Sequence, residues 1–348
     1  MPHAGFIPGR DAVHHGRYKN GVHRIKKEFD LIEKIKQQWF LIGLVFVFMS
    51  VMADRTGALS GIGFFFKTHY GPDFVIFIIF LFSGIIIKTE QIRAGIRDVK
   101  VTATALFVIF IVSPLSAAAL SVLPVETGVV IGMCIVAVMP TTLSSGVVMT
   151  GRAGGNMAHA LFITILANFI SIVSIPFILS LLLSFLGEKT LVQIDQYAIM
   201  KKLFFLVLIP MASGMAIKAF YGKIQDKNLK VLQTANQVFV ICIVFMAASG
   251  SRDVFIQKTG SLFSVVVMVV MFHLMLLFSS FFLSYLFNIK KGRRESQIFM
   301  GSQKTLPLSV ILQVTLFPEY GSALLVCVVH HIIHLIIDGY LAVKLGEQ

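Results

Sequence analysis

The sequence predicts an all-α, polytopic membrane protein, and its composition supports this fold class in two ways. Of its 348 residues, 56% are apolar and only 14% are charged, and the mean hydropathy is +0.85. A soluble domain of this length needs more charge to cover its surface, so lipid is the solvent for most of the chain. Many of the 27 glycines and 10 prolines lie in apolar runs, which transmembrane helices tolerate because neighbouring helices and water satisfy the freed backbone groups.

Ten apolar stretches have about the length needed to cross roughly 30 Å of hydrocarbon, which takes about 20 residues. They are residues 39–59, 72–87, 101–122, 128–150, 156–186, 202–220, 234–250, 262–287, 296–317 and 322–343. We therefore divide the chain into a basic cytoplasmic tail at 1–38, a ten-helix domain at 39–343 and a short cytoplasmic tail at 344–348. The first tail is either solvated or forms an amphipathic helix on anionic lipid.

The basic residues indicate the orientation of these spans. If the amino terminus is inside, the tails and inner loops hold 22 of the 30 Lys and Arg residues, and the outer loops hold 7. Positive charge accumulates in cytoplasmic loops, so we expect both termini in the cytoplasm and the chain in a plasma or inner membrane. This topology, and not a nucleic-acid partner, explains the net charge of +13. The thirtieth basic residue, Lys304, lies within the ninth span.

A weak internal repeat relates the two halves. VIFIIFLFSG, ending at Gly84, resembles VICIVFMAASG, ending at Gly250, and TLSSGV from Thr142 resembles TLPLSV from Thr305. The offsets, 166 and 163 residues, nearly agree. Each copy would hold five helices, an odd number, so the second would be inverted relative to the first, as in many secondary transporters. Short matches in apolar sequence also arise by chance, so the repeat is a hypothesis.

In inverted-repeat transporters, ligands bind where corresponding helices are interrupted near the bilayer midplane. Two spans combine polar residues with helix breakers: the fourth, from Pro140 to Asn156, and the ninth, from Gly301 to Ser309. We predict that both are broken and cross, and that with the fifth span they bind the substrate or ion. The candidate binding residues are Thr141, Thr142, Ser144, Ser145, Asn156, Thr164, Asn168, Gln303, Lys304 and Thr305.

The same residues carry a resemblance to a known family. The fourth and fifth spans resemble the crossover region of the bile acid:sodium symporters, in their divergent SBF-like branch, and the ninth span resembles their corresponding motif. The matching residues are Pro140, Ser145, Thr150, Gly155, Asn156 and Thr164, with Gly301 and Gln303 in the ninth span. The resemblance covers residues 39–343. It implies a panel domain of spans 1, 2, 6 and 7, a core of the other spans, sodium beside the crossing helices and an organic anion between the domains.

Departures from the family pattern concern its sodium ligands. The family's glutamate falls on Phe299, an asparagine on Gly146, a serine on Ala160 and a second asparagine on Lys304, while Ser145, Thr164 and Gln303 remain as candidate ligands. Hard cations prefer oxygen ligands, usually with a carboxylate, so sodium coupling is doubtful. A fixed ammonium at position 304 can take the electrostatic role of the ion, or it can tether crossover carbonyls structurally.

The tenth span places His330, His334 and Asp338 at i, i+4 and i+8, which stacks them on one helix face beside His331. A proton relay or a transition-metal site uses such spacing, and interhelical hydrogen bonding is the alternative. His273, alone in the eighth span, is expected to be structural. No further Cys or His cluster supports a metal site, so we expect no cofactor and only Na⁺ or H⁺ as coupling ion.

These features favour a secondary-active transporter of a small organic anion, with altered or absent sodium coupling. A proton-coupled carrier or exporter, and a regulatory membrane protein of transporter fold that affects calcium homeostasis, are the alternatives. An intramembrane enzyme is disfavoured because the chain lacks a nucleophile motif and a HExxH pattern. The expected partners are the lipid bilayer and the anionic solute, with no nucleic acid, and the oligomeric state is left open.

Overall fold

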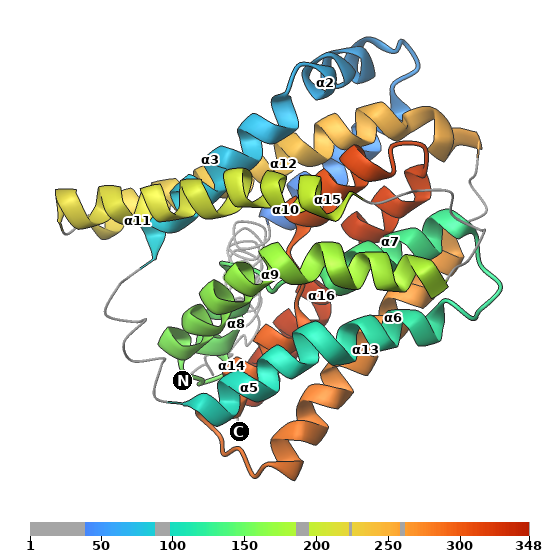
Figure 1. Ribbon diagram of the computed structural model, residues 1–348. Helices are drawn as coiled ribbons and strands as arrows, with labels where there is room; N and C mark the ends of the chain where they lie inside the picture. Colours follow the sequence, from blue (N-terminus) through green and yellow to red (C-terminus); the bar gives the residue numbers. More distant parts are fainter. Residues whose placement is uncertain (1–38, 88–97, 186–194, 223–224, 258–261, 348) are drawn as a thin grey trace, which may run out of the picture. The chain divides into compact units, whose positions relative to one another are not determined.

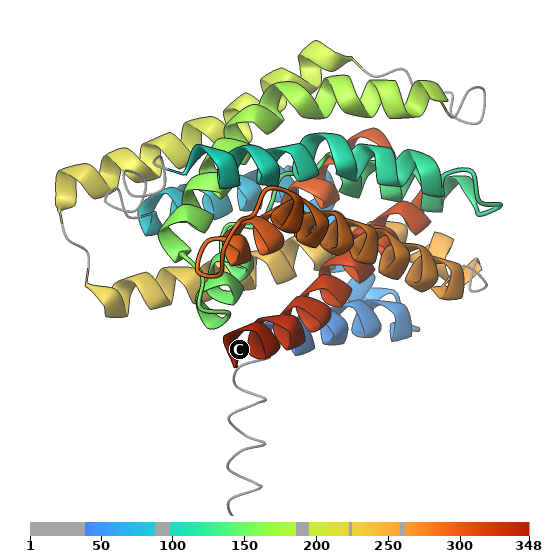
Figure 2. The same cartoon turned by 90° about the horizontal axis from the view of Figure 1, so that it is seen from below.

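The computed structural model describes residues 39–87, 98–185, 195–222, 225–257 and 262–347. The chain forms two compact units, one ending at Phe46 and the other, which holds the polar centre described below, starting at Val47. Within the described ranges every regular element is helical (Figures 1 and 2). The amphipathic helix considered for the tail at 1–38 lies outside the described residues.

The described part begins with a helix at Trp39–Ala53. The following elements are α2 (Ala58–Thr68), α3 (Gly71–Ile86), α5 (Val99–Phe107), η1 (Val108–Val112), α6 (Ser113–Leu120), α7 (Thr127–Val138), α8 (Ser145–Arg152), α9 (Met157–Phe185), α10 (Gln196–Leu203), η3 (Phe204–Leu208), α11 (Ile209–Tyr221), α12 (Asp226–Gln257), α13 (Leu262–Leu286), α14 (Arg294–Ser302), α15 (Leu306–Leu316) and α16 (Gly321–Gly346).

Length and composition identify six helical stretches of the described chain as candidate membrane spans. These are Val99–Leu120, Met157–Phe185, Gln196–Tyr221, Lys227–Arg252, Leu262–Leu286 and Gly321–Gly346. The helix at Trp39–Ala53 and α2 together make a seventh, bent by 111°, so the expected single helix at 39–59 is wrong at its carboxyl end. The other expected spans are α3, which has 16 residues, and the pairs α7 with α8 and α14 with α15. The count of ten therefore stays a prediction.

Two π-helical segments lie within long spans, and each is followed by a proline. Pro114 comes two residues after η1, and Pro210 two residues after η3. Proline has no N–H to donate, and in a π-helical register residue i would bond to the carbonyl of residue i−5. For Pro114 that carbonyl belongs to Ile109, so the sequence leaves a free acceptor inside the span.

The helices pack in two groups. α3 packs against α11 and α12, and α12 also packs against α2. In the second group α7 packs against α16 and α6, and α14 against α13, α5 and α8 (Figures 1 and 2). All residues of α7 from Gly128 to Val138 and of α14 from Glu295 to Ser302 are buried, so these two elements form the interior of the second group.

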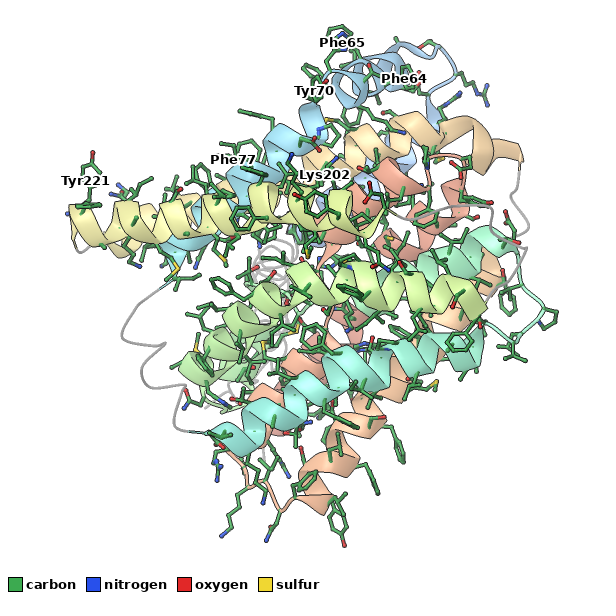
Figure 3. The ribbon with its side chains drawn as sticks, in the orientation of Figure 1. Phe64, Phe65, Tyr70, Phe77, Lys202 and Tyr221 are labelled. Atoms are coloured by element: carbon green, nitrogen blue, oxygen red, sulfur yellow. The ribbon has the colours of Figure 1, made fainter. Side chains whose placement is uncertain are left out.

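Large apolar side chains lie on the outer faces of the helices. Phe64, Phe65 and Tyr70 project outward from α2 and its carboxyl end (Figure 3), and Phe278 on α13 is 72% exposed. Soluble monomers seldom expose so many large apolar groups. These faces are therefore suited to lipid, as the composition predicts.

Two glycines allow α3 and α11 to pack backbone to backbone. A Cβ atom added at Gly84 would collide with the Met211 carbonyl, and one added at Gly214 would collide with the Leu81 carbonyl. Both obstacles are backbone atoms, which cannot move aside as a flexible side chain can. Glycine at these two positions is therefore a packing requirement.

An ion pair joins the start of α5 to the start of α14. Arg293 donates Nε to Asp98 Oδ2 and Nη2 to Asp98 Oδ1, a bidentate arrangement, and Asp98 also caps α5 by accepting the Val101 N–H at 3.3 Å. Partial burial raises the pKa of the Asp98 carboxyl, but the hydrogen bonds from Arg293 and Val101 outweigh it and the net pKa lies below the usual value. The ionised form of Asp98 is therefore favoured by the fold.

We expect Gly84→Ala to lower the free energy of unfolding by about 1–3 kcal/mol, the usual cost of overpacking. Gly61 is the matched control, because it lies in helix α2 with no atom within 4 Å of an added Cβ; Gly61→Ala should be neutral or stabilising by about 0.5–1 kcal/mol. Thermal unfolding of the purified protein in detergent measures both. Equal melting temperatures for the two variants would contradict the backbone packing.

We expect Asp98→Asn to keep the helix cap and lose the ion pair, at a cost of about 0.5–1 kcal/mol because Arg293 is half exposed. Since the folded-state pKa is depressed, the ion pair stabilises the fold above the unfolded-state pKa of about 3.9 and this contribution is lost as pH falls further. The melting temperatures of wild type and variant should therefore differ at pH 7, and this difference should narrow as the pH falls below about 3.9. Asp195→Asn, at the cap of α10, controls for capping alone.

Candidate functional site

The two predicted helix interruptions are present. α7 ends at Val138 and α8 begins at Ser145, while α14 ends at Ser302 and α15 begins at Leu306 with Pro307 in its first turn. In the first break, Met139 is extended, as expected for the residue before a proline. The breaks touch directly, because the Thr305 N–H donates to the Pro140 carbonyl at 3.0 Å. Two segments about 160 residues apart in sequence thus meet at their non-helical backbone.

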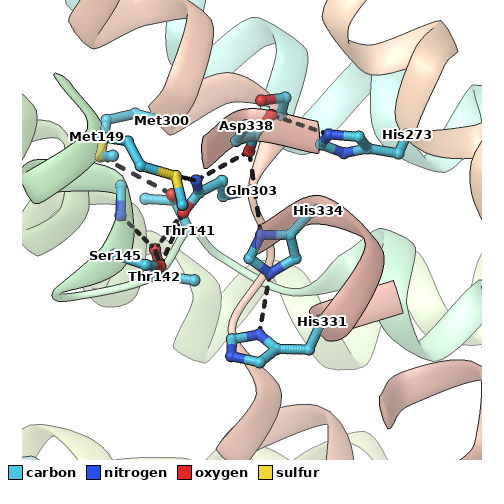
Figure 4. Close-up of polar contacts among 12 residues, drawn as sticks. Thr141, Thr142, Ser145, Met149, His273, Met300, Gln303, His331, His334 and Asp338 are labelled. Carbon is cyan, nitrogen blue, oxygen red and sulfur yellow. Dashed lines mark hydrogen bonds and ion pairs between the residues drawn. The ribbon is translucent and has the colours of Figure 1, made fainter. Parts of the chain in front are cut away.

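Gln303 connects the second break to the hydroxyl groups of the first (Figure 4). Its Oε1 accepts from Thr142 Oγ1 at 2.7 Å and from Ser145 Oγ at 2.9 Å. Its Nε2 donates to Asp338 Oδ2 at 2.8 Å and to Met149 Sδ. The acceptor end of this fully buried amide therefore binds the hydroxyls of the first break and the start of α8, and its donor end bridges Met149 on α8 and Asp338 on α16.

Lys304 extends from the same break into a group of backbone carbonyls. Its Nζ donates to Met139 O at 3.0 Å, Ile109 O at 3.1 Å and Ala137 O at 3.3 Å, and the side chain is 1% exposed. Met139 and Ala137 belong to the end of α7, where carbonyls lack intrahelical partners. Ile109 is the π-segment carbonyl that Pro114 cannot serve. One ammonium thus serves acceptors at a helix end and beside a proline, and it shares the Ala137 carbonyl with the Ser113 hydroxyl.

An apolar cluster occupies the positions where the resemblance would place sodium ligands. Phe299 and Met300 are completely buried and pack with Ala160 and Ile163. The Met300 methyl group lies where a Cβ at Gly146 would be. The Met300 sulfur accepts from Thr164 Oγ1 at 3.1 Å and contacts Thr141 Oγ1 at 3.8 Å.

The histidine face of α16 joins this centre through Asp338. Asp338 Oδ1 lies 3.0 Å from His273 Nε2 on α13, and Oδ2 lies 4.0 Å from His334 Nδ1. His334 Nε2 lies 2.9 Å from His331 Nδ1, and the His330 ring packs against those of His273 and His334. The expected i, i+4, i+8 face is therefore present. His273, expected to be only structural, is its partner on another helix.

The remaining candidate residues divide into two sets. Thr164 and Asn168 are buried, and Asn168 Nδ2 donates to Thr164 O at 2.8 Å. Ser144 and Asn156 are exposed, and Asn156 Oδ1 accepts the His159 N–H near the start of α9. The structure thus gathers the buried candidates around the two breaks and leaves these two exposed residues outside them.

The described residues form no cluster that is arranged as a metal site. Across the described ranges, no group of three or more His, Cys, Asp or Glu side chains is placed to hold a metal ion. The imidazoles around Asp338 contact one another and the carboxylate, as a hydrogen-bonded chain does. Sequence spacing could not reveal His273, because it lies 65 residues from Asp338 on a different helix.

An all-helical membrane protein whose buried polar groups converge where two broken helices meet has the features of a secondary transporter. Comparison with known proteins agrees: the profile of the SBF-like CPA transporter family matches residues 38–347. The chain belongs to this family of multi-pass membrane transporters.

Named relatives support the assignment. The chain is 30% identical over 278 residues to the probable sodium/metabolite cotransporter BASS4, chloroplastic, of Arabidopsis thaliana, which covers 76% of this chain and 63% of the plant protein. It is 25% identical over 312 residues to sodium/bile acid cotransporter 7 of Xenopus tropicalis, covering 86% of this chain and 88% of that protein. The Danio rerio protein of the same name is 26% identical over 306 residues, covering 86% and 89%. The chain thus spans under two thirds of the plant protein's length.

We expect Gly146→Ala to destabilise the protein by about 1–2 kcal/mol, because the new methyl group collides with the buried Met300 side chain. Met300→Ala alone should cost about 2–5 kcal/mol. The double variant should be more stable than the sum of the two losses predicts, with a coupling of about 1–2 kcal/mol. Thermal unfolding in detergent measures this cycle, and strict additivity would show that Met300 does not fill the space beside Gly146.

Proposed function

We propose that this chain is a secondary-active carrier of a small organic anion that works by alternating access and needs no sodium. The names of its relatives refer to metabolites and bile acids, and many such solutes are carboxylates or conjugated acids. The observation that carries the proposal is the position of Lys304, a buried cation bound to carbonyls at the meeting point of the two breaks.

Lys304 supplies the positive charge that a bound sodium would otherwise provide. Carbonyl oxygens at helix ends carry partial negative charge, and a cation among them removes their mutual repulsion and their need for water. The same charge attracts an anion to the break. A covalently attached ammonium cannot leave with the solute, so it fills this electrostatic role without acting as a co-transported ion.

The surroundings of the presumed sodium position support the same proposal. Sodium needs several oxygen ligands and usually a carboxylate, whereas Phe299, Met300 and Ala160 supply apolar groups. Ser145 and Thr164 keep their hydroxyls, which lie within hydrogen-bond distance of protein acceptors: Gln303 Oε1 for Ser145, and Ala160 O or Met300 Sδ for the single Thr164 proton. Two hydroxyl oxygens alone fall short of the ligand set that a hard cation prefers.

The proposed architecture has ten spans in two inverted five-helix repeats, with α2, α3, α10 to α12 and the first helix as panel and the rest as core. The breaks in the fourth and ninth predicted spans support it, because they occur at corresponding places in the two halves. The bias of basic residues supports cytoplasmic termini in a plasma or inner membrane. The anion would bind between panel and core, next to Thr142, Ser145 and Gln303.

A proton-coupled carrier is the second candidate. The specific observation in its favour is the contact of Asp338 with His273 and Gln303, which joins titratable groups to the break. This candidate is compatible with the first, since a carrier that lacks a sodium site still needs a driving ion.

We expect uptake of a radiolabelled bile acid into proteoliposomes to stay within about twofold when sodium is replaced by choline. Lys304→Asn should reduce uptake at least about tenfold, because a charge-assisted interaction of roughly 1.5–3 kcal/mol is lost. Lys227→Asn, an exposed residue at the start of α12, is the control and should be neutral. Strict sodium dependence of the wild type would contradict the proposal, and full activity of Lys304→Asn would make the lysine a bystander.

A further inference from the structure

Asp338 is buried, and among the described residues no Lys or Arg side chain is its partner. It is 0% exposed, and its carboxylate contacts, among the described residues, are the Gln303 amide and the imidazoles of His273 and His334. The Lys304 ammonium donates to Ile109, Ala137 and Met139 and is committed there. The charge of an ionised Asp338 therefore has to be balanced by an imidazole, or the carboxyl has to carry a proton.

The balance of charge fixes the number of protons that His273 and Asp338 hold together. A buried carboxylate without a positive partner is strongly disfavoured. His273 and Asp338 together therefore hold one more proton than a neutral imidazole and a carboxylate, whether that proton is on Nε2 or on Oδ1. His273 is itself 0% exposed and its Nδ1 has no partner among the described residues, so the extra proton is not stabilised from the other side of the ring.

Release of this proton requires a change of surroundings. Deprotonation would leave a buried anion beside His330, His331 and His334, which are at most 6% exposed, with Lys304 as the nearby cation from the second break. Water must reach Asp338 before the proton can leave to solvent. Proton exchange is thus tied to a conformation more open than the one described here.

Gln303 transmits the proton state to the first break. Its amide group donates to Asp338 Oδ2 and accepts from Thr142 and Ser145. A hydrogen bond to an ionised carboxylate is stronger than one to a neutral carboxyl group. Protonation of Asp338 itself would loosen Gln303, and deprotonation of the pair would hold it firmly between α16 and α8.

We propose that the His273–Asp338 pair is the coupling-proton site of this carrier and that it binds one proton together with each organic anion. This inference rests on the proposed transport function and names its driving ion. The titratable groups that face the pair are His330, His331 and His334 from α16 and Lys304 from the break between α14 and α15. Gln303 is the positioning residue between the proton site and the hydroxyls of the first break.

The first experiment uses the proton as its only probe. Infrared difference spectra of the full-length protein, in phosphatidylcholine vesicles, follow as a function of pH both the C=O stretching band of a protonated carboxyl and the ring band of a protonated imidazole, so the proton is detected on either Oδ1 or Nε2. We expect a titrating band in the wild type that is absent in Asp338→Asn and shifted by roughly one pH unit or more in His273→Gln, which keeps a hydrogen-bonding side chain but cannot be charged. His159→Gln and Asp98→Asn are the matched controls and should leave the band in place, because neither residue contacts the pair.

A second measurement separates this inference from the transport proposal. In vesicles loaded for counterflow of a radiolabelled bile acid, an inward proton gradient should raise wild-type accumulation about threefold or more. His273→Gln should lose this response, and the control His159→Gln should keep it. A band that is unchanged in Asp338→Asn, or an unshifted band in His273→Gln, overturns the proton site even if transport is present. Absent bile acid movement with the expected titration contradicts the transport proposal for this substrate and leaves the proton site supported.

Discussion

The ammonium of Lys304 and the three carbonyls around it are the interaction on which the polar centre depends. Helix ends and a proline leave these acceptors without N–H partners, and in a membrane interior no water is present to replace them. Three partially negative oxygens directed at one point would repel one another if the cation were absent. Pro114, the end of α7 and Lys304 thus form a single constraint, although they lie far apart in the sequence.

The internal cation changes which types of side chain can lie beside it. With the positive charge supplied by Lys304, positions 299 and 300 are free to hold apolar side chains, and Gly146 leaves the space that Met300 fills. Such a centre gains packing, and in the proposed carrier it holds no exchangeable sodium ion. In the proposed carrier the driving ion binds elsewhere in the core, and Asp338 is a buried carboxylate that contacts the break.

The sequence alone predicts the parts of this centre that depend on local chemistry. Pro140 and Pro307 predict the breaks, and the spacing from His330 to Asp338 predicts a polar face on one helix. It does not predict which helix faces Asp338, because periodicity defines a stripe and not its neighbour, so the role of His273 is missed. The polar residues Asp54 and Arg55 mark the end of the first span in the sequence, but they do not predict the second helix that follows the bend, where Asp54 accepts the N–H groups of Thr56, Gly57 and Ser60.

Competition for hydrogen bonds explains how a proton and an anion can favour the same rearrangement. An anion bound at the first break needs donors, and the hydroxyls of Thr142 and Ser145 now donate to Gln303. They become available only if the Gln303 amide turns away, which its bond to an ionised Asp338 opposes. A proton carried by the Asp338 carboxyl itself neutralises it and weakens the restraint, so in that state the proton promotes anion binding. By thermodynamic linkage the anion then promotes proton binding to the same extent, which is the energetic requirement for carrying both in one cycle.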